Sequence, residues 1–173
     1  MKVGRYSFSG DDDDETYSIQ SIHRHPDYYT MDWDEHVNDY NIFKINGLSK
    51  QTPIKINPSP GIPKAGSMVT VIGEGSMSAD PNTFQETTSD TLQEVQLKII
   101  PNDDCSEYED PTRNVTYSNR IFENMMCTTG GKHNQRDGCA FDSGSPLIVE
   151  ENDEDIVVGM VSWGIGMTII GVL

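Results

Sequence analysis

Short apolar runs with a period of two, separated by turn residues, constrain the fold of this chain more than any other feature. In residues 93–100, Val95, Leu97 and Ile99 alternate with polar and charged residues. Residues 16–25 repeat the pattern. Because successive side chains of a β-strand point to opposite faces, this period predicts half-buried strands at 16–25 and 93–100.

Four further runs are short and almost entirely apolar, which is typical of strands buried on both faces. They are NIFKI (41–45), MVTVIG (68–73), PLIVE (146–150) and DIVVGMVSW (155–163). No long stretch has the 3.6-residue period of an amphipathic helix. Many short strands with turn residues between them predict an all-β fold, either a sandwich or a barrel.

One helical turn is expected in PNDDCSEYE, residues 101–109. The side chain of Asn102 can cap its N-terminus. The carboxylates of Asp103 and Asp104 follow in the first turn, where the helix dipole favours negative charge.

A proline-rich stretch separates the early strands from the later ones. Residues 49–66, SKQTPIKINPSPGIPKAG, contain four prolines and no periodic apolar face. Proline and glycine at this density interrupt strands and helices. We therefore expect a connector between two β units, residues 1–48 and residues 67–173.

The last 18 residues, 156–173, carry no charge, and this length is sufficient for a membrane-spanning helix. They also contain four glycines and many β-branched residues. That composition favours two short strands around a glycine turn. We therefore expect no membrane segment, with a lipid-spanning helix as the alternative.

Acidic residues dominate the charge, with 28 Asp and Glu against 12 Lys and Arg and a formal net charge of −16. Such a surface repels phosphate backbones and anionic lipids, which argues against nucleic acid and membranes as partners, and it attracts cationic substrates. The run DDDDE, residues 11–15, is expected to be a solvated loop. A calcium site is the alternative there, because clustered carboxylates suit a hard cation when backbone carbonyls complete the shell.

The three cysteines are Cys105, Cys127 and Cys139, and their odd number leaves at least one thiol without a partner in the chain. The first ten residues, MKVGRYSFSG, lack the apolar core of a signal peptide, so they give no direct sign of secretion. Asn114 begins an N-x-T triplet, which is a glycosylation acceptor only in the secretory pathway.

Several motifs occur in an order that resembles the trypsin-like serine peptidases. DGCAFDSGSPLIV at 137–149 is similar to their nucleophile segment, D-x-C-x-G-D-S-G-G-P-L. GMVSWGIG at 159–166 resembles their substrate-binding strand, and HPDY at 25–28 followed by NDYNIFKI at 38–45 resembles the segment of the catalytic aspartate. The stretch from Asn102 to Gly130 also follows the disulfide loop of that family.

The resemblance implies two antiparallel β-barrels with the active site between them. Residues 1–48 are then the back part of an incomplete first barrel, and residues 49–66 are the connector. Residues 67–173 are a second barrel that lacks the C-terminal helix of the family. No cofactor is expected.

Carried over by motif, the resemblance assigns Ser143 as the nucleophile and Asp39 as the acid that orients a histidine base. The backbone N–H groups of Phe141 and Ser143 form the oxyanion hole. Asp137 lies at the base of the specificity pocket, so cleavage after Arg or Lys is implied. The residues that line the substrate cleft are Ser162 and Gly164.

The absence of the histidine base is the main departure from the family pattern. The family places this histidine in an A-A-H-C turn well before the aspartate. This chain has no such turn. His23 and His25 precede Asp39 too closely, and neither His36 nor His133 matches the position of the base.

Other departures concern the nucleophile block. Phe141 and Ser145 replace glycines, and Asp142 is expected to be a buried carboxylate without the terminal amine that pairs with it in the family. Cys139 has no partner because Met167 follows the SWG motif where the family has a cysteine. The resemblance implies a disulfide bridge between Cys105 and Cys127 and an extracellular location.

The leading interpretation is a serine endopeptidase domain that is inactive as this chain because the base is absent. The alternative is a non-catalytic serine protease homologue that uses the fold for binding. An acidic calcium-binding module centred on residues 11–15 is the third hypothesis.

Overall fold

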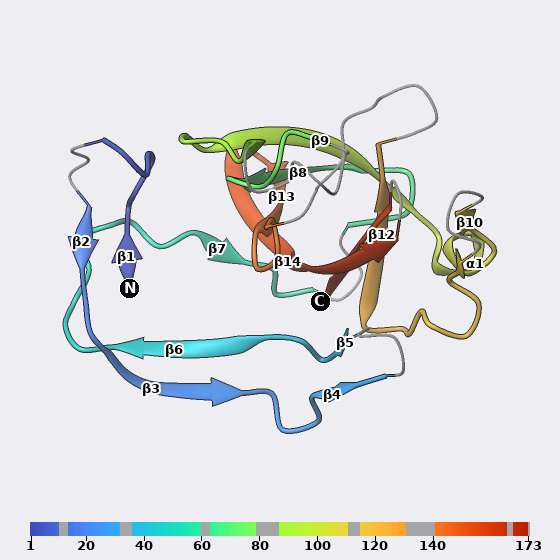
Figure 1. Ribbon diagram of the computed structural model, residues 1–173, viewed down its shortest axis with the longest axis horizontal. Coiled ribbons are helices and arrows are strands. Elements are labelled where there is room, and N and C mark those ends of the chain that lie inside the picture. The colour runs from blue at the N-terminus through green and yellow to red at the C-terminus, as the bar shows by residue number, and fades with distance from the viewer. Residues whose placement is uncertain are drawn as a thin grey trace.

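The computed structural model describes residues 1–10, 14–31, 36–59, 63–78, 87–110, 115–130, 141–165 and 168–172. Within these ranges the fold is almost entirely β, as predicted, and its main element is a closed six-stranded antiparallel barrel (Figure 1). The barrel strands are β8 (Met68–Gly73), β9 (Gln93–Ile100), β12 (Met125–Thr129), β13 (Pro146–Glu151), β14 (Glu154–Ile165) and β15 (Thr168–Val172).

The barrel strands are ordered β13-β8-β9-β12-β15-β14, and β14 pairs back with β13 to close the barrel. A two-residue turn joins β13 to β14, with Asn152 at φ 55° and Asp153 at φ 62°. Asn and Asp tolerate this left-handed conformation, which matches the twist of a tight hairpin. The predicted strands at 68–73 and 93–100 match β8 and β9 residue for residue.

The remaining strands are short. They pair as β1 (Lys2–Val3) with β2 (Glu15–Thr16), β3 (Ile19–Arg24) with β6 (Asn41–Ile45), β4 (Tyr29–Thr30) with β5 (His36–Val37), and β10 (Glu109–Asp110) with β11 (Val115–Thr116). A short strand in the proline-rich stretch, β7 (Lys55–Ile56), lies parallel to β14. Among the described residues, the N-terminal strands form two-stranded sheets and close no second barrel.

The barrel interior is filled by one apolar cluster that draws on β8, β9, β12, β13 and β14. On β9 the predicted alternation is confirmed, since Leu97 and Ile99 are 0% and 5% exposed and the charged neighbours point outward. The expectation of full burial was wrong for β8, where Met68 is 49% exposed and Val69 is buried. On β8 the side chains alternate between the barrel interior and the surface. On β13 the expectation was confirmed, since residues 147–149 are all buried.

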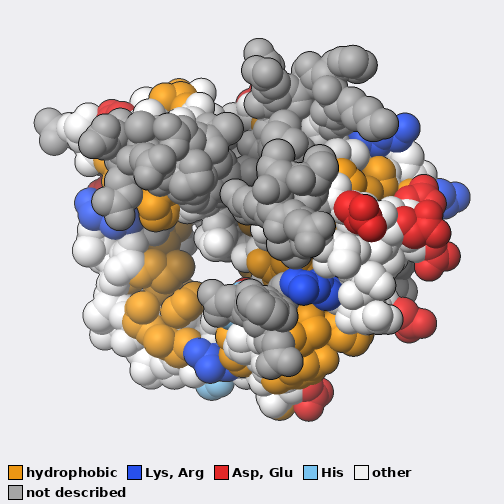
Figure 2. Space-filling view, turned by 45° about the vertical axis from the view of Figure 1, so that its right-hand side comes forward, with side chains coloured by type: hydrophobic (Ala, Val, Ile, Leu, Met, Phe, Trp, Pro, Cys, Tyr) orange, Lys and Arg blue, Asp and Glu red, His pale blue; other side chains and the backbone are white. Residues whose placement is uncertain are grey.

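The β3–β6 ribbon does not have the burial that its sequence predicted. Ile19 and Ile22 on β3 are 44% and 58% exposed, and Ile42 and Phe43 on β6 are 64% and 43% exposed. Two strands alone cannot bury an apolar face, and within the described residues β3 and β6 form a sheet only with each other. Figure 2 shows hydrophobic side chains on both sides of an opening through the molecule.

The predicted helical turn is confirmed as α1 (Asn102–Ser106), but the predicted cap was wrong. Pro101 occupies the N-cap, and no side chain caps the helix. The amide of Asn102 instead donates to the carbonyl oxygens of Phe122 and Met125, at 3.1 and 3.0 Å. Asn102 therefore ties α1 to the start of β12.

The uncharged C-terminal stretch forms the antiparallel pair of β14 and β15, as expected, and both strands belong to the barrel. Within the described ranges, no helix has the length and apolar character needed to cross a membrane.

Candidate functional site

The predicted nucleophile lies in a tight loop that leads into β13. The N–H of Ser145 donates to the carbonyl of Asp142 at 2.9 Å, and Gly144 adopts a φ of +88°, which favours glycine. Val161 on β14 anchors the loop, because its carbonyl accepts from Gly144 N–H and its own N–H donates to the carbonyl of Ser145, both at 2.8 Å. These hydrogen bonds therefore fix the position of the Ser143 loop relative to β14.

Asp142 is buried, at 8% exposure, as the sequence predicted. Its Oδ1 accepts a hydrogen bond from Gly75 N–H at 2.9 Å, a partner that the sequence does not indicate. The carboxylate fits because Gly73 and Gly75 have no side chains, and a Cβ at either position would clash with it. This hydrogen bond offsets part of the desolvation cost of the carboxylate.

Asp39, the predicted orienting acid, lies between β5 and β6 and makes a hydrogen bond with the barrel. Ser162 Oγ donates to Asp39 Oδ2 at 2.7 Å, across a sequence separation of 123 residues. The preceding residue, Asn38, has a φ of 53° and accepts from the amide of Asn124 at 2.6 Å. The structure thus brings Asp39, the predicted orienting acid, together with Ser162, a predicted residue of the substrate cleft.

Consecutive residues of β14 contact both halves of the predicted catalytic pair. Val161 binds the loop of Ser143 through its backbone, and Ser162 binds Asp39 through its side chain. The next residue, Trp163, donates from Nε1 to the carbonyl of His36 at 3.1 Å. Three successive residues of one strand therefore join the loop of Ser143 to the segment of Asp39.

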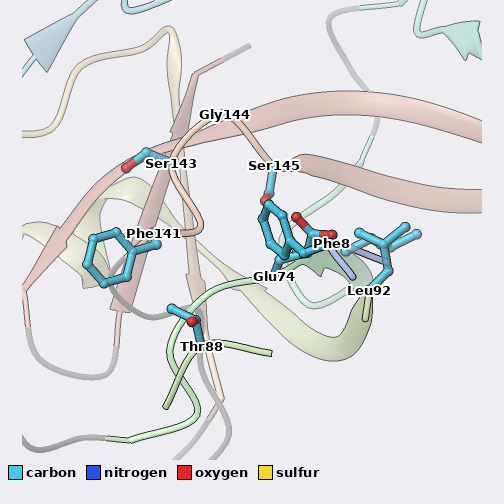
Figure 3. A pocket seen from close by; sticks show the side chains of 10 residues that line it. Phe8, Glu74, Thr88, Leu92, Phe141, Ser143, Gly144 and Ser145 are labelled. Carbon is cyan, nitrogen blue, oxygen red and sulfur yellow. The ribbon is translucent and has the colours of Figure 1, made fainter. Parts of the chain in front are cut away.

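Ser143 lines a cavity of about 520 Å³ (Figure 3). Two phenylalanines from distant segments, Phe8 and Phe141, also line it. The rest of the lining consists of Ile72, Gly73, Glu74, Thr88, Leu92, Gly144 and Ser145. Phe8 was not predicted as a site residue, because nothing in the sequence around it indicates a contact with a segment more than 130 residues away.

Phe141 has a φ of +77°, a conformation that favours glycine, and it stands where the resemblance expects a glycine. A side chain in the left-handed region costs about 1–2 kcal/mol. Replacing Phe141 by glycine is expected to raise the free energy of unfolding by roughly 0.5–1 kcal/mol, because part of the gain is lost to the greater chain entropy of glycine in the unfolded state.

Urea denaturation followed by tryptophan fluorescence measures this difference. The Phe141→Ala variant is the matched control, since it also loses the exposed ring but keeps a Cβ at positive φ. An equal change in both variants would show that the loss of the ring, rather than the backbone conformation, changes the free energy of unfolding.

The three described histidines have local partners. His23 hydrogen-bonds with Ser21 at 2.9 Å, and the ring of His25 packs on Tyr40 at a centroid distance of 4.8 Å. His36 hydrogen-bonds through Nδ1 with the hydroxyl of Tyr28 at 3.0 Å. His133, Asp137 and Cys139 lie outside the described residues, as does Met167.

The acidic run is described only at its end, since residues 11–13 lie outside the described ranges. Asp14 pairs with Lys2, and Glu15 accepts the N–H of Lys50 at 2.9 Å. Among the residues that the structure describes, no group of three or more His, Cys, Asp or Glu could hold a metal ion.

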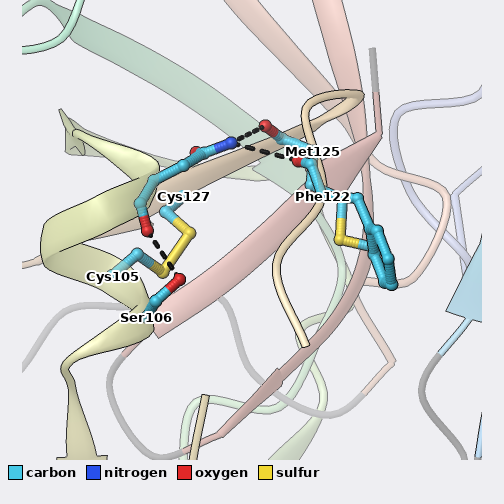
Figure 4. The surroundings of a disulfide bond; sticks show 6 residues. Cys105, Ser106, Phe122, Met125 and Cys127 are labelled. Atoms are coloured by element: carbon cyan, nitrogen blue, oxygen red, sulfur yellow. Dashed lines mark hydrogen bonds between the residues drawn. A yellow bond between two sulfur atoms is a disulfide. The ribbon is translucent and has the colours of Figure 1, made fainter. Parts of the chain in front are cut away.

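The predicted bridge between Cys105 and Cys127 is confirmed (Figure 4). It joins α1 to β12, with a Cα–Cα distance of 6.3 Å and both residues fully buried. The bridge belongs to a second apolar cluster with Val37 and Tyr117, against which Trp163 packs. Since Trp163 follows Ser162, this cluster supports the strand that contacts Asp39.

Comparison with known proteins places this arrangement in a family. The trypsin of Squalus acanthias is 29% identical over 168 residues, which are 96% of this chain and 65% of that protein. Trypsin-1 of Astacus astacus is 29% identical over 155 residues, or 87% of this chain and 57% of that protein. Mannan-binding lectin serine protease 1 of Mus musculus is 26% identical over 160 residues, or 89% of this chain and 20% of that protein.

The chain thus spans less than two thirds of the length of these relatives. A family model described as Trypsin matches residues 1–172, almost the whole chain. On that match, the chain belongs to the trypsin family.

Proposed function

We propose that this chain is the part of a serine endopeptidase domain that carries the nucleophile and the orienting acid. Ser143 attacks the peptide carbonyl, and Asp39 holds a histidine base in the correct orientation. The observation that supports this pairing is the pair of contacts on β14, where Val161 holds the Ser143 loop and Ser162 donates to Asp39.

In this proposal the backbone N–H groups of Phe141 and Ser143 bind the developing oxyanion. Ser162 and Gly164 line the cleft, and Asp137 pairs with an Arg or Lys side chain of the substrate. The buried disulfide favours an extracellular location, because such bonds persist in oxidising compartments.

We expect negligible turnover by the 173 residues alone. None of the four histidines matches the position of the base, and without a base the Ser143 hydroxyl keeps its proton. The test is to incubate the purified chain with an arginine ester and with the matched lysine and alanine esters. The Ser143→Ala variant serves as the control.

Equal and near-background rates for the chain and the Ser143→Ala variant are the expected result. Hydrolysis of the arginine ester that disappears in the variant would refute the inactivity. The transcript sequence upstream of Met1 distinguishes the endopeptidase from a non-catalytic homologue. An in-frame A-H-C turn supports the endopeptidase, and its absence supports the non-catalytic protein.

The second candidate is a non-catalytic homologue that binds polypeptides, and the conformation of Phe141 favours it. Its φ of +77° forces a bulky residue into a glycine-like conformation at the oxyanion hole. A binding protein tolerates such strain, because it does not depend on the alignment of the Phe141 N–H with an oxyanion.

A further inference from the structure

Two exposed phenylalanines face the cavity beside Ser143. Phe8 is 57% exposed and Phe141 is 56% exposed, although both side chains are large and apolar. Figure 3 shows their rings on opposite sides of the cavity, with Thr88 below and Ser145 near Phe8. An aromatic-walled cavity with a few polar groups is typical of a binding site.

The position of Phe8 is held by contacts with the barrel. Phe8 N–H donates to the carbonyl of Asp90 at 2.9 Å, and the guanidinium of Arg5 lies 3.8 Å from the centroid of the Phe8 ring. Arg5 in turn pairs with Glu74 at 2.9 Å. The cation–π contact and the ion pair fix the ring against the wall that Glu74 and Leu92 form.

A second set of hydrogen bonds fastens the segment on both sides of Phe8. The carboxylate of Asp90 accepts from the hydroxyls of Ser9 and Ser7, at 2.7 and 3.0 Å, and from Ser9 N–H at 3.1 Å. The bonds from Ser9 and Ser7 lower the pKa of the Asp90 carboxyl. Phe8 is therefore an exposed ring in a well-bound segment.

The charge of the whole chain, more than that of the lining, restricts the charge of an occupant. Among the described residues that line the cavity, Glu74 is the only charged one; its Oε2 pairs with Arg5, and its Oε1 is buried without a hydrogen-bond partner. The whole chain carries a net charge of −16, so its field attracts cations. The hydroxyls of Ser143, Ser145 and Thr88 can meet the backbone of a polypeptide.

We propose that this cavity binds a cationic peptide segment, which inserts one large apolar side chain between the rings of Phe8 and Phe141. The proposal rests on the proposed function for the class of ligand, a polypeptide, and it requires no bond cleavage. Phe8 and Phe141 determine the selectivity for the apolar side chain, and the acidic surface attracts the flanking Lys or Arg residues.

Fluorescence anisotropy with three labelled peptides of equal length tests this site. The first has one Phe flanked by Lys residues, the second has Ala in place of Phe, and the third has Glu in place of Lys. We expect the Phe–Lys peptide to bind about 5- to 100-fold tighter than the Ala peptide, since each of two aromatic pairs contributes to affinity. The Glu peptide is expected to bind more weakly, with the difference decreasing at high salt.

Two variants locate the site on the protein. Phe8→Ala and Phe141→Gly are each expected to weaken binding of the Phe–Lys peptide by about 2- to 10-fold. Ile42→Ala is the control, because Ile42 is another exposed apolar residue, at 64% exposure, on β6. Melting temperatures of all variants show whether they are folded.

Equal affinity for the Phe and Ala peptides, no binding of any peptide, or the same loss in the control would overturn the site. Equal affinity for the Lys and Glu peptides would overturn the proposed preference for cationic flanking residues. The outcome is separate from the proposed function, since ester hydrolysis without a preference for the Phe peptide would refute only this inference. Binding by a chain that hydrolyses nothing would support it.

Discussion

Replacing Leu147 by alanine is expected to lower the free energy of unfolding by about 2–5 kcal/mol. Leu147 is 0% exposed and belongs to the apolar cluster inside the barrel. Its side chain fills the space beside Gly171, where a Cβ would clash with it. Truncation leaves a cavity that β13 and β15 cannot close, because both strands are fixed by their hydrogen bonds in the barrel.

Urea denaturation followed by tryptophan fluorescence measures the loss. Met68→Ala is the control, because Met68 lies in the same barrel and is 49% exposed, so its truncation is expected to cost less than about 1 kcal/mol. A loss below 1 kcal/mol for Leu147→Ala would contradict the packing described for the barrel. Since Leu147 lies four residues after Ser143, we also expect the loop of Ser143 to become more sensitive to proteolysis.

Removing the Cys105–Cys127 bridge is expected to cost about 2–4 kcal/mol. The bridge closes a loop with a sequence separation of 22 residues and so limits the conformations of the unfolded chain. For a chain of this size, such a loss lowers Tm by about 5–15 °C. The double variant Cys105→Ala, Cys127→Ala avoids placing hydroxyls in the buried cluster.

Calorimetry of the wild type and the double variant, each with and without reductant, measures the contribution of the bridge to Tm. Reductant is expected to lower the Tm of the wild type and to leave that of the double variant unchanged. A change of less than about 2 °C in the wild type would contradict the stabilising role. Because Trp163 packs on the same cluster, we expect its fluorescence to report the loosening.

The strands were predictable because short apolar runs and the two-residue alternation of apolar and polar residues are visible in the sequence. The runs at 41–45, 68–73 and 93–100 match β6, β8 and β9 at both ends. Their burial was less predictable, since it depends on a second layer that the local pattern does not contain. Ile42 on β6 is exposed, and Val69 on β8 is buried, although both lie in equally apolar runs.

The local context was also insufficient for Asn102. Its position before two aspartates predicts an N-cap, but its amide reaches Phe122 and Met125 in the neighbouring strand region instead. Two hydrogen bonds to carbonyl groups of another segment replace the single bond that a cap would make. A residue-level propensity was overridden by tertiary contacts.

The sequence by itself determined the all-β class, the positions of β8, β9, β13 and β14, the cysteine pair and the motif around Ser143, since each depends on neighbours within a few residues or on a family pattern. Only the tertiary structure decided that Ser162 donates to Asp39, that Gly75 holds Asp142, and that Phe8 faces Phe141. These contacts join segments that are far apart in the chain, and they form because the closed barrel brings the segments together. Periodicity carries no information about such distances.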